Sequence, residues 1–518
     1  MTLSPTTGRF SGRAMLAGLA LAAVLALPRV GMGDDGMAAK VEALVPDLER
    51  YIEKGMADFD VPGLAIGIVT GDKLVYAKGF GSRSKGGAPV DADTAFQIGS
   101  TTKAFLAATM ALGVDRELLA WDDRIVDRHP GFRLFDGWVT QEFRLYDIIA
   151  QRSGMPTFAN DFYGMLGASK EEMIHSLRHV EPTASFRADF TYTNITHLVA
   201  GDIVAAAFAA ADWKAVVTDE ILTPLGMTAT TLTLEAMEAA ANHAVGHVWL
   251  PEGTIEVPFT RFMPYDFEGA GAINSTVADM AHWLRLNLAD GTFDGERIVS
   301  AENLAITRMP RVAIADKLSY AMGWVLQSTP GGVITWHNGG TTSFGAYVGL
   351  ALDSDLGVVV LTNETNVGMP DAIGAWTLDR LLGNPEVDHL GTTLAAVRSG
   401  AEAAAAQFER PAEARPPLAA ASLAARYDNP VFGATDVVAD GDALVATVAT
   451  GAKLRLDPWD GNVYTVALLP EGEMATLAPN LGPGPLGFAA FGVDPGGKMD
   501  RFRVTFFQEP HEYLFVRR

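Results

Sequence analysis

The chain has 518 residues, 48% of them hydrophobic, which is enough for a sizeable core and for about two or three domains. Its formal net charge of -23, from 39 Lys and Arg against 62 Asp and Glu, argues against nucleic acid and anionic membrane surfaces as partners, because both attract basic proteins. The chain contains no cysteine, which excludes disulfides, thiolate metal sites and a lipidated cysteine.

The N-terminus is typical of an export signal. Arg9 and Arg13 precede an apolar run, AMLAGLALAAVLAL at residues 14–27, and small residues follow it as a cleavage zone. The run is shorter than the ~20 apolar residues that span a bilayer, so no stable membrane span is expected. We therefore expect residues 1–33 to be a signal peptide and the protein to be exported, with the periplasm as its expected location.

The central part of the chain predicts a domain over residues 40–393 that contains both strands and helices. Residues 63–81 (GLAIGIVTGDKLVYAKGFG) predict two strands joined by a turn at Gly71. Residues 96–112 (FQIGSTTKAFLAATMAL) predict a buried helix, and helical segments alternate with loops from 115 to 300. Strands return at residues 332–340, 345–352 and 357–363. Strands at both ends of a helical region predict one α/β sheet closed by sequence-distant segments.

The composition changes between residues 394 and 424, which are rich in Ala, Glu, Arg and Pro. This stretch predicts a short helix and a linker, and therefore a domain boundary. Residues 425–518 contain several strand-like runs separated by turn signals, among them Asp440-Gly441. They predict a second, small antiparallel β-barrel or sandwich.

The predicted helix at residues 96–112 carries a lysine, Lys103, in an otherwise apolar run. A buried ammonium is costly unless it is paired or loses its proton. Ser100 lies three residues earlier, on the same helix face, so the amine can reach the hydroxyl. A neutral, desolvated lysine can act as the base for a serine nucleophile, and a helix N-terminus favours the negative charge that develops.

The Ser-x-x-Lys spacing alone is weak evidence, because it arises readily by chance and occurs twice in the chain. Ser82 and Lys85 also fit the spacing, but they stand in a polar stretch before Gly86-Gly87. We interpret that second match as a solvated loop.

Two further polar residues precede another apolar helix, at residues 191–207 (TYTNITHLVAGDIVAAA). Tyr192 beside a neutral lysine can relay a proton, and Asn194 can hold both Lys103 and a substrate carbonyl. The alternative is that both residues merely cap the helix. The triplet Tyr-Asp-Asn at 427–429 shows how readily such a pattern arises.

A histidine and two glycines occupy the strand-like segment WHNGGTTSFGAYVG, residues 336–349. Gly339 and Gly340 allow a substrate backbone to approach, and the Gly340 N–H could donate to an oxyanion. His337 would then line the site, although a single histidine is often only a structural residue.

The order of these motifs, Ser-x-x-Lys, then Tyr-x-Asn, then a strand-borne His-x-Gly, resembles the serine β-lactamase and penicillin-binding-protein superfamily. The likeness is greatest to the class C β-lactamase-like branch, which includes DD-peptidases, D-aminopeptidases and esterases. Comparable segments include FQIGSTTKAF, DIIAQRSGMP, ILTPLGMTATTL, GAGAINSTVADMAHWL and YAMGWVL, between residues 45 and 365. The final segment, with ARYDNPVFG, resembles the lipocalin-like barrel appended to some relatives.

The resemblance implies an antiparallel sheet flanked by helices, with an inserted, mostly helical region. It also implies that Ser100 forms an acyl-enzyme and that Lys103 activates it. Tyr192 would act as general base or proton relay, while Asn194 orients Lys103 and the substrate amide.

The third motif departs from the Lys-Thr-Gly of that superfamily. By resemblance, His337 takes the place of its lysine, and the N–H groups of Ser100 and Gly340 form the oxyanion hole. His337-Asn338-Gly339 lacks the permanent cation and the hydroxyl that bind the carboxylate of a β-lactam or of a terminal D-alanine. Strong β-lactam turnover is therefore not expected.

The expected function is a serine peptidase or amidase acting on small or unusual peptides, without a cofactor. Alternatives within the same fold are a carboxylesterase and a weak β-lactamase. An alternative of another class is a non-catalytic binding or sensor protein, which would be expected to have lost Ser100, Lys103 or Tyr192. The sequence leaves the oligomeric state open.

A metal site is disfavoured by the spacing of the histidines. The pairs His175/His179 and His243/His247 are four residues apart, but neither contains the glutamate of the H-E-x-x-H zinc motif. The G-x-S-x-G motif of α/β-hydrolases is also absent.

Overall fold

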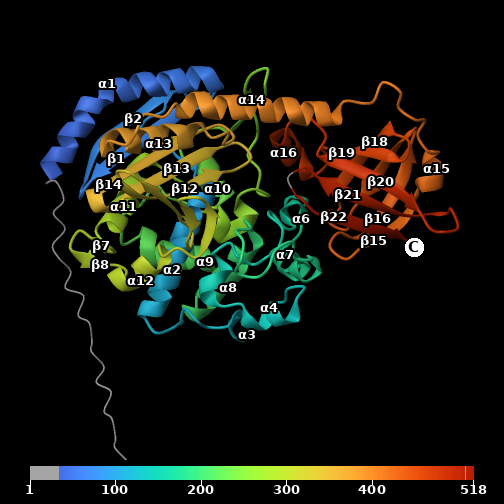
Figure 1. Cartoon of the computed structure of the whole chain (residues 1–518), viewed down its shortest axis with the longest axis horizontal. Helices are drawn as coiled ribbons and strands as arrows, with labels where there is room; N and C mark the ends of the chain where they lie inside the picture. Colours follow the sequence, from blue (N-terminus) through green and yellow to red (C-terminus); the bar gives the residue numbers. More distant parts are fainter. Residues whose placement is uncertain (1–33, 508) are drawn as a thin grey trace, which may run out of the picture.

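The computed structural model describes residues 34–507 and 509–518. Figure 1 shows two units: a larger one, which contains the central sheet, and a smaller β-barrel formed by the C-terminal part of the chain. The expected signal peptide, residues 1–33, lies outside the described residues. Within the described ranges, no helix combines the length and apolar character needed to cross a membrane.

The larger unit is built on one eight-stranded sheet in which every neighbouring pair is antiparallel. The first strand, β1, pairs with β14, so sequence-distant segments close the sheet as predicted. In sheet order the strands are β2 (Lys73–Gly81), β1 (Gly63–Thr70), β14 (Leu356–Thr362), β13 (Gly345–Ala351), β12 (Gly332–Gly340), β11 (Val325–Thr329), β10 (Leu318–Tyr320) and β9 (Val312–Ala315).

Helices cover both faces of this sheet, which explains why its central strands are continuously apolar. The covering helices are α1 (Asp34–Phe59) and α13 (Met369–Leu382) on one face and α11 (Val277–Leu288) on the other. Along β1, Leu64 and Ile66 face the cluster formed with α1 and α13, whereas Ala65 and Val69 face the larger cluster with α11. All eight residues of β1 are buried as a result.

A mostly helical region is inserted between β2 and β9. Its helices, besides α11, are α2 (Thr102–Asp115), α3 (Ile125–Arg128), α4 (Gly137–Glu142), α5 (Leu145–Ile148), α6 (Asp161–Met165), α7 (Lys170–Ser176), α8 (Ile195–Ala207), α9 (Trp213–Val217), α10 (Leu234–Ala239) and α12 (Ala301–Thr307). Three two-stranded pairs accompany them: β3 (Phe96–Gln97) with β6 (Asn274–Ser275), β4 (His247–Val248) with β5 (Ile255–Glu256), and β7 (Thr292–Phe293) with β8 (Glu296–Arg297).

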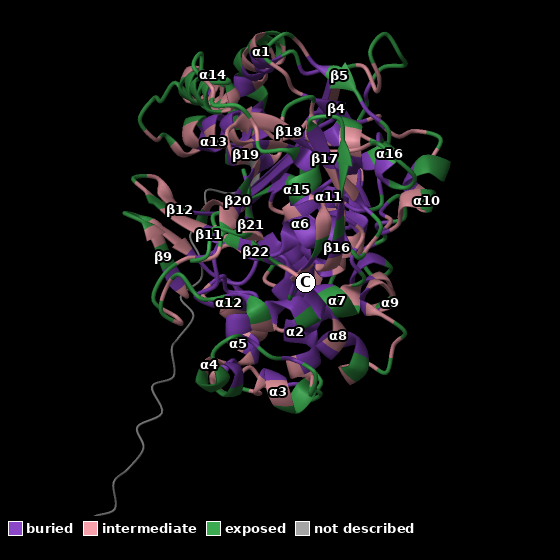
Figure 2. Cartoon of the chain, turned by 90° about the vertical axis from the view of Figure 1, so that its right-hand side faces the viewer, coloured by how far each residue is buried: buried purple, intermediate pink, exposed green. Residues whose placement is uncertain are grey.

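Helix α2 lies at the centre of the larger unit. Every residue from Thr102 to Gly113 is buried, in agreement with the predicted buried helix. Phe105 stacks on Trp283 of α11 at 3.8 Å between ring centroids, and the Trp213 indole N–H donates to Thr109 Oγ1. Because α2 is apolar all round, it is stable only inside the core. Figure 2 shows buried residues around α2, intermediate and exposed residues along the labelled strands β9, β11 and β12, and exposed residues on the outer helices and loops.

The C-terminal strands form a closed, eight-stranded antiparallel barrel, the first of the two folds that the sequence left open. The strands are β15 (Ala425–Asn429), β16 (Gly433–Asp440), β17 (Ala443–Thr447), β18 (Lys453–Asp460), β19 (Val463–Leu468), β20 (Gly487–Val493), β21 (Met499–Phe506) and β22 (Glu512–Arg517). Side chains alternate inward and outward; in β22, for example, Tyr513 and Phe515 are buried while Leu514 and Val516 are exposed. Tyr427, in the second Tyr-x-Asn triplet, donates its hydroxyl proton to Leu423 O and is a structural residue of the barrel.

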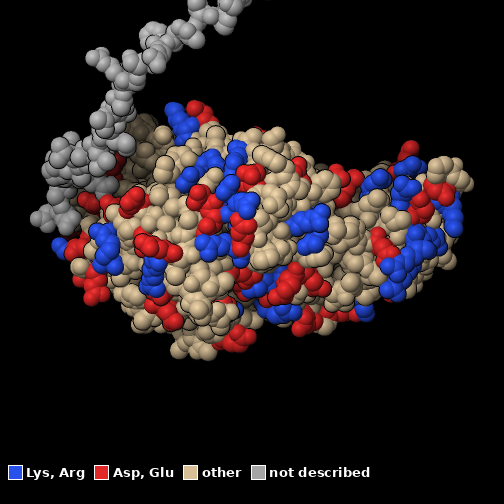
Figure 3. Space-filling model, turned by 90° about the horizontal axis from the view of Figure 1, so that it is seen from below, with Lys and Arg blue, Asp and Glu red and all other residues tan. Residues whose placement is uncertain are grey.

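A long helix, α14 (His389–Phe408), precedes the barrel and lies along the top of the larger unit in Figure 1. It is followed by a loop and the short helix α15 (Ala420–Leu423). A further helix, α16 (Met474–Leu477), lies between β19 and β20. On the face seen in Figure 3, acidic and basic side chains are interspersed over most of the surface.

The barrel also packs directly against the helical region of the larger unit. Phe162 of α6 stacks on Phe506 of β21 at 4.1 Å, and Tyr163 meets Phe432 edge-on at 5.3 Å. Thr342, two residues beyond β12, donates a hydrogen bond to Asn480 from the β19–β20 connection. The two units therefore share an interface with both apolar and polar contacts.

Candidate active site

The turn that leads into α2 carries the predicted nucleophile and its base. Ser100 lies in a 3-10 turn, Gly99–Thr101, and Lys103 lies in the first turn of α2, fully buried. The Lys103 amine Nζ lies 2.8 Å from each of three oxygens: Ser100 Oγ, Asn194 Oδ1 and the carbonyl of Ala270. The structure therefore brings Ser100, Lys103 and Asn194 together, as predicted from sequence-distant motifs.

The hydrogen-bond pattern around Lys103 satisfies an unprotonated amine as well as an ammonium that donates to all three oxygens. The Asn194 amide is oriented, because its Nδ2 donates to Asp161 Oδ2 at 2.6 Å and its Oδ1 must then face the lysine. A neutral amine has two N–H groups for Asn194 Oδ1 and Ala270 O, and one lone pair to accept the Ser100 proton. Burial lowers the pKa of Lys103 to about 7, against an opposing effect of the Asp161 charge.

Asp161 is a buried acid that the motif analysis did not identify. Burial raises its pKa to about 7, while the hydrogen bond from Asn194 and the charge of Lys103 act in the opposite direction. Its second oxygen, Oδ1, is buried without a hydrogen-bond partner among the described residues. No sequence motif marks Asp161, because its importance depends only on the position of α6 beside Asn194.

The segment before α8 places Tyr192 over the same amine. The Tyr192 ring centroid lies 4.8 Å from Lys103 Nζ, and its side chain hydrogen-bonds Ser100. Burial raises the Tyr192 pKa, which the hydrogen bond to Ser100 partly opposes, so the phenol remains protonated near neutral pH. A protonated phenol suits a proton relay better than a base. Asn194 occupies the N-cap position of α8, yet its side chain makes no capping hydrogen bond, which rules out the capping alternative for this residue.

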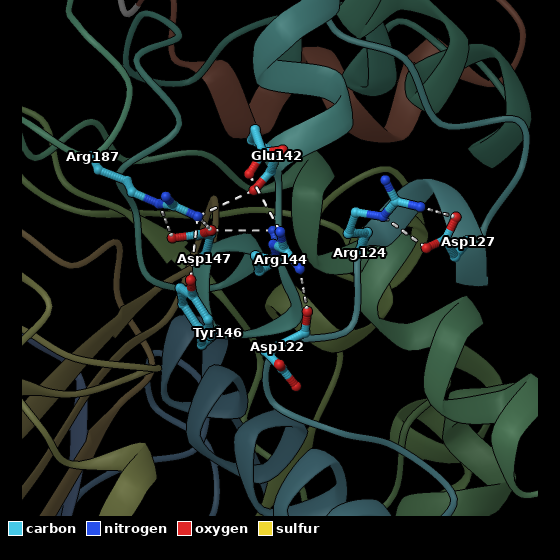
Figure 4. Close-up of polar contacts among 8 residues, drawn as sticks. All are labelled: Asp122, Arg124, Asp127, Glu142, Arg144, Tyr146, Asp147 and Arg187. Atoms are coloured by element: carbon cyan, nitrogen blue, oxygen red, sulfur yellow. Dashed lines mark hydrogen bonds and ion pairs between the residues drawn. The ribbon is translucent and has the colours of Figure 1, made fainter. Parts of the chain in front are cut away.

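The Tyr192 segment is held by buried polar contacts from α5 and the turn after it. Gln151 accepts from the Thr193 N–H at 2.7 Å through Oε1 and donates to the Thr193 carbonyl through Nε2. Earlier in the segment, Arg187 donates twice to the buried carboxylate of Asp147, and Figure 4 shows this pair with its neighbours Tyr146 and Glu142. These contacts fix the approach of Tyr192 and Asn194 to α2.

His337 of β12 is buried and neutral. Its Nδ1 contacts the Asn338 carbonyl, which can only accept, so Nδ1 carries the proton. Nε2 is then an acceptor, and the Tyr320 hydroxyl donates to it at 3.0 Å. Burial, with a smaller contribution from the Lys103 charge, lowers the His337 pKa to about 3. The His337 ring lies 6.3 Å from that of Tyr192, so the structure places it in the same cluster.

The end of β12 is open along one edge and lies against the Ser100 turn. Strand β11 pairs with β12 only as far as Trp336, which leaves residues 337–340 without a strand on that side. A Cβ atom on Gly339 would lie 1.9 Å from Ile98 O, and one on Gly99 would lie 2.7 Å from Gly340 N. Glycine is therefore required for this close approach, and at Gly99 also for its φ of +50°.

This approach places Gly340 beside the turn that carries Ser100. Asn366 supports the strand end by donating to Gly339 O at 2.8 Å. The two N–H groups expected to form an oxyanion hole, those of Ser100 and Gly340, thus belong to adjacent backbone segments.

The other motif matches do not join this cluster. Lys85, from the second Ser-x-x-Lys match, pairs with Asp60 at 3.2 Å at the surface. His247 Nδ1 contacts the Asn363 carbonyl at 2.8 Å. Among the described residues there is no group of three or more His, Cys, Asp or Glu side chains that could hold a metal ion.

Comparison with known proteins identifies the family. The family model described as Beta-lactamase matches residues 48–383, more than half of the chain. The chain belongs to the beta-lactamase family. It is therefore a member of the serine β-lactamase and penicillin-binding-protein superfamily, which the order of motifs predicted.

The relatives of this family member include two fungal unguisins hydrolases. One, from Aspergillus campestris, is 29% identical over 343 residues, which cover 62% of this chain and 62% of that protein. The chain thus spans less than two thirds of this relative. The other, from Aspergillus violaceofuscus, is 25% identical over 523 residues, covering 90% of this chain and 88% of that protein.

Two solved structures share the fold. The octameric penicillin-binding protein homologue from Pyrococcus abyssi covers 91% of this chain and 99% of its own, with a TM-score of 0.59 and 22% identity. A class C β-lactamase from Rhodobacter sphaeroides covers 65% of this chain and 98% of its own, with a TM-score of 0.54 and 23% identity. At these identities the likeness shows the fold alone.

The pKa of Lys103 leads to a prediction about pH dependence. We expect kcat/KM to rise with pH through about 7, because Lys103 accepts the Ser100 proton only when unprotonated. Asp161→Asn removes a negative charge that raises the lysine pKa, so the rising limb should move to lower pH. Profiles of both proteins measured from about pH 5 to 9 test this. A limb that moves to higher pH would contradict the assignment.

The close approach of β12 leads to a second prediction. Gly339→Ala should lower kcat by about 10²-fold or more, because its Cβ would push Ile98 away and displace the Gly340 N–H. Gly137→Ala is the matched control, since a Cβ there meets nothing within 4 Å. Steady-state kinetics and thermal melts of both variants make the comparison. A Gly339→Ala enzyme with unchanged kcat would show that the strand end does not form the oxyanion hole.

Proposed function

We propose that the protein is an exported serine hydrolase that forms an acyl-enzyme on Ser100, and that it acts as a peptidase or amidase on small or unusual peptides. The observation that carries the proposal is the buried Lys103 amine, 2.8 Å from Ser100 Oγ and oriented by Asn194. Two relatives named as hydrolases support it, as does the family. Export rests on the composition of residues 1–33.

The acylation step assigns a task to each group. Lys103 takes the Ser100 proton as Oγ attacks the substrate carbonyl carbon, and the carbonyl π electrons move onto its oxygen. The Ser100 and Gly340 N–H groups stabilise that oxyanion. When the oxyanion collapses, the C–N bond breaks and the departing amine receives a proton, which passes from Lys103 through Tyr192. Water then attacks the acyl carbon, and its proton passes through Tyr192 to Lys103. Lys103 returns a proton to Ser100 Oγ as the ester bond breaks, which releases the acid.

The neutral His337 supports substrates that do not depend on a terminal carboxylate. In this site the third motif supplies a buried imidazole, hydrogen-bonded to Tyr320, and no positive charge. A carboxylate placed beside it would lose its hydration without gaining an ion pair. Blocked, cyclic or internal peptide bonds fit such a site better than a free terminal D-alanine.

This reasoning leads to a prediction about specificity. The kcat/KM for a peptide with a C-terminal carboxamide should be at least as high as that for its free-acid counterpart, to within an uncertainty of about threefold. The matched pair differs only in charge, so the comparison isolates the third motif. A preference of tenfold or more for the free acid would indicate a cation at the site and contradict the proposal.

The nucleophile is tested by covalent labelling and a substrate panel. One equivalent of a fluorophosphonate should react with the intact protein. The Ser100 Oγ–P bond forms as fluoride leaves, and the protein mass rises by that of one phosphonyl group. Ser100→Ala should abolish both the label and turnover, and Ser82→Ala, in the second Ser-x-x-Lys match, is the matched control that should retain both. The panel covers amino-acid anilides, linear and cyclic peptides, p-nitrophenyl esters and a chromogenic cephalosporin.

The same experiment separates the alternatives. Turnover of esters alone would indicate a carboxylesterase, and efficient turnover of the cephalosporin would indicate a β-lactamase. Absence of any label would leave the non-catalytic binding protein, and a label that survives Ser100→Ala would disprove the nucleophile.

A further inference from the structure

The segment of residues 509–511, just before the last barrel strand, contacts α6 of the larger unit. It carries Glu509, whose side chain is 2% exposed although it lies between β21 and β22 of the barrel. Helix α6 lies beside β22 in Figure 1, and the stacking of Phe162 on Phe506 brings α6 into contact with the preceding strand, β21. A buried glutamate at this place needs a physical reason, because burial of a carboxyl group is costly.

Barrel side chains bind the residues on both sides of Asp161. Glu509 Oε1 accepts from the backbone N–H of Phe162 at 2.6 Å. The Tyr513 hydroxyl lies 3.0 Å from Oδ1 of Asn160, and it also contacts Glu509 Oε2 in a short hydrogen bond. Residues 160 and 162 are therefore both held by the barrel.

Asp161, between them, is directed toward the catalytic lysine. Its Oδ2 accepts from Asn194 Nδ2, and Asn194 Oδ1 accepts from Lys103 Nζ. A continuous series of contacts thus runs from Glu509 through the backbone of α6 to Asp161, Asn194 and Lys103. The proposed acylation reaction assigns no role to Glu509.

The hydrogen-bond count indicates that Glu509 is protonated. The Tyr513 hydroxyl has one proton but lies within bonding distance of two oxygens, Asn160 Oδ1 and Glu509 Oε2. The Asn160 Oδ1 can only accept, since its Nδ2 donates to Ser176 Oγ. Both contacts are satisfied when Tyr513 donates to Asn160 and a protonated Glu509 donates to Tyr513.

The surroundings of Glu509 agree with this count. Burial, reinforced by the Asp161 charge, raises the Glu509 pKa to about 8, against opposing hydrogen bonds. His511 lies 3.9 Å from Glu509 Oε2, and burial lowers its pKa to about 4. It therefore supplies no positive charge at neutral pH that would favour an ionised Glu509.

We propose that Glu509 is a positioning residue for Lys103: protonated and paired with Tyr513, it holds residues 160–162 so that Asp161 meets Asn194. The barrel is then part of the machinery that acylates Ser100. The proposal rests on the proposed roles of Ser100 and Lys103.

Four variants test it. Glu509→Ala removes both contacts, and Tyr513→Phe removes the hydroxyl that joins Glu509 to Asn160. Glu509→Gln keeps an acceptor for Phe162 and a donor for Tyr513, and so imitates the protonated acid. Tyr427→Phe is the matched control, because Tyr427 is a second buried barrel tyrosine, and its hydroxyl donates to Leu423 O of α15, on the side of the barrel away from α6.

The readouts are kcat, KM, the rate of fluorophosphonate labelling of Ser100, and the thermal melt. Glu509→Ala should slow labelling and kcat at least tenfold, with KM within about threefold, because the lysine is misplaced and substrate contacts are unchanged. Tyr513→Phe should slow labelling severalfold. Glu509→Gln should remain within about threefold of wild type, and Tyr427→Phe should lower the melting temperature while labelling at the wild-type rate.

Each other outcome identifies what has failed. If Ser100 of the wild type is not labelled, the proposed function is wrong. If the wild type is labelled and Tyr513→Phe or Glu509→Ala reacts equally fast, only the positioning role is wrong. A folded Glu509→Gln protein as slow as Glu509→Ala, or a Tyr427→Phe protein as slow as Tyr513→Phe, would also overturn it. Should Glu509→Ala not fold, Glu509→Gln and Tyr513→Phe still decide the matter.

Discussion

Removal of the Lys103 amine from water is the constraint on which the rest of the site depends. Lowering its pKa from 10.5 to about 7 corresponds to a full cost of about 5 kcal/mol below pH 7, since each pKa unit is worth about 1.4 kcal/mol. The unfolded chain binds this proton more tightly, so the destabilisation of the folded state grows as the pH falls from about 10 to about 7 and is fully present below that. It is comparable with the whole stability of a small domain. The apolar packing around α2, including the stack of Phe105 on Trp283, must offset it.

The same constraint explains why the site is assembled from distant parts of the chain. A buried amine needs partners for both N–H groups, and they come from Asn194 before α8 and from the carbonyl of Ala270. The nucleophile must stay accessible, and the open edge of β12 provides room beside Ser100 because β11 ends its pairing at Trp336. Lys103 must therefore be buried, whereas Ser100, three residues earlier in the same turn, must stay accessible to the substrate.

Much of this arrangement could be predicted from the sequence because it depends on local spacing. Ser100 and Lys103 share one helix face by their separation, and the strand-like runs with turn signals between them in residues 425–518 indicated a β fold. The contacts of Asp161, Ala270 and Tyr320 could not be predicted, because no local pattern specifies which distant residue a side chain meets. Barrel closure was also beyond local patterns, since β15 and β22 pair from opposite ends of the segment. Glu509 looks like an ordinary surface residue of a β-connection until α6 is placed against it.

The barrel also affects the charge balance at the lysine. An Asp161 open to water would be ionised at neutral pH, and its charge would favour the ammonium form of Lys103. Burial raises the Asp161 pKa to about 7, and barrel residues contact both of its chain neighbours. A protonated Glu509 adds no second negative charge there. In the proposed arrangement, the barrel excludes water from the acid while placing its hydrogen bond on Asn194. The amine can then be oriented by the Asp161–Asn194 pair without being held in its charged form.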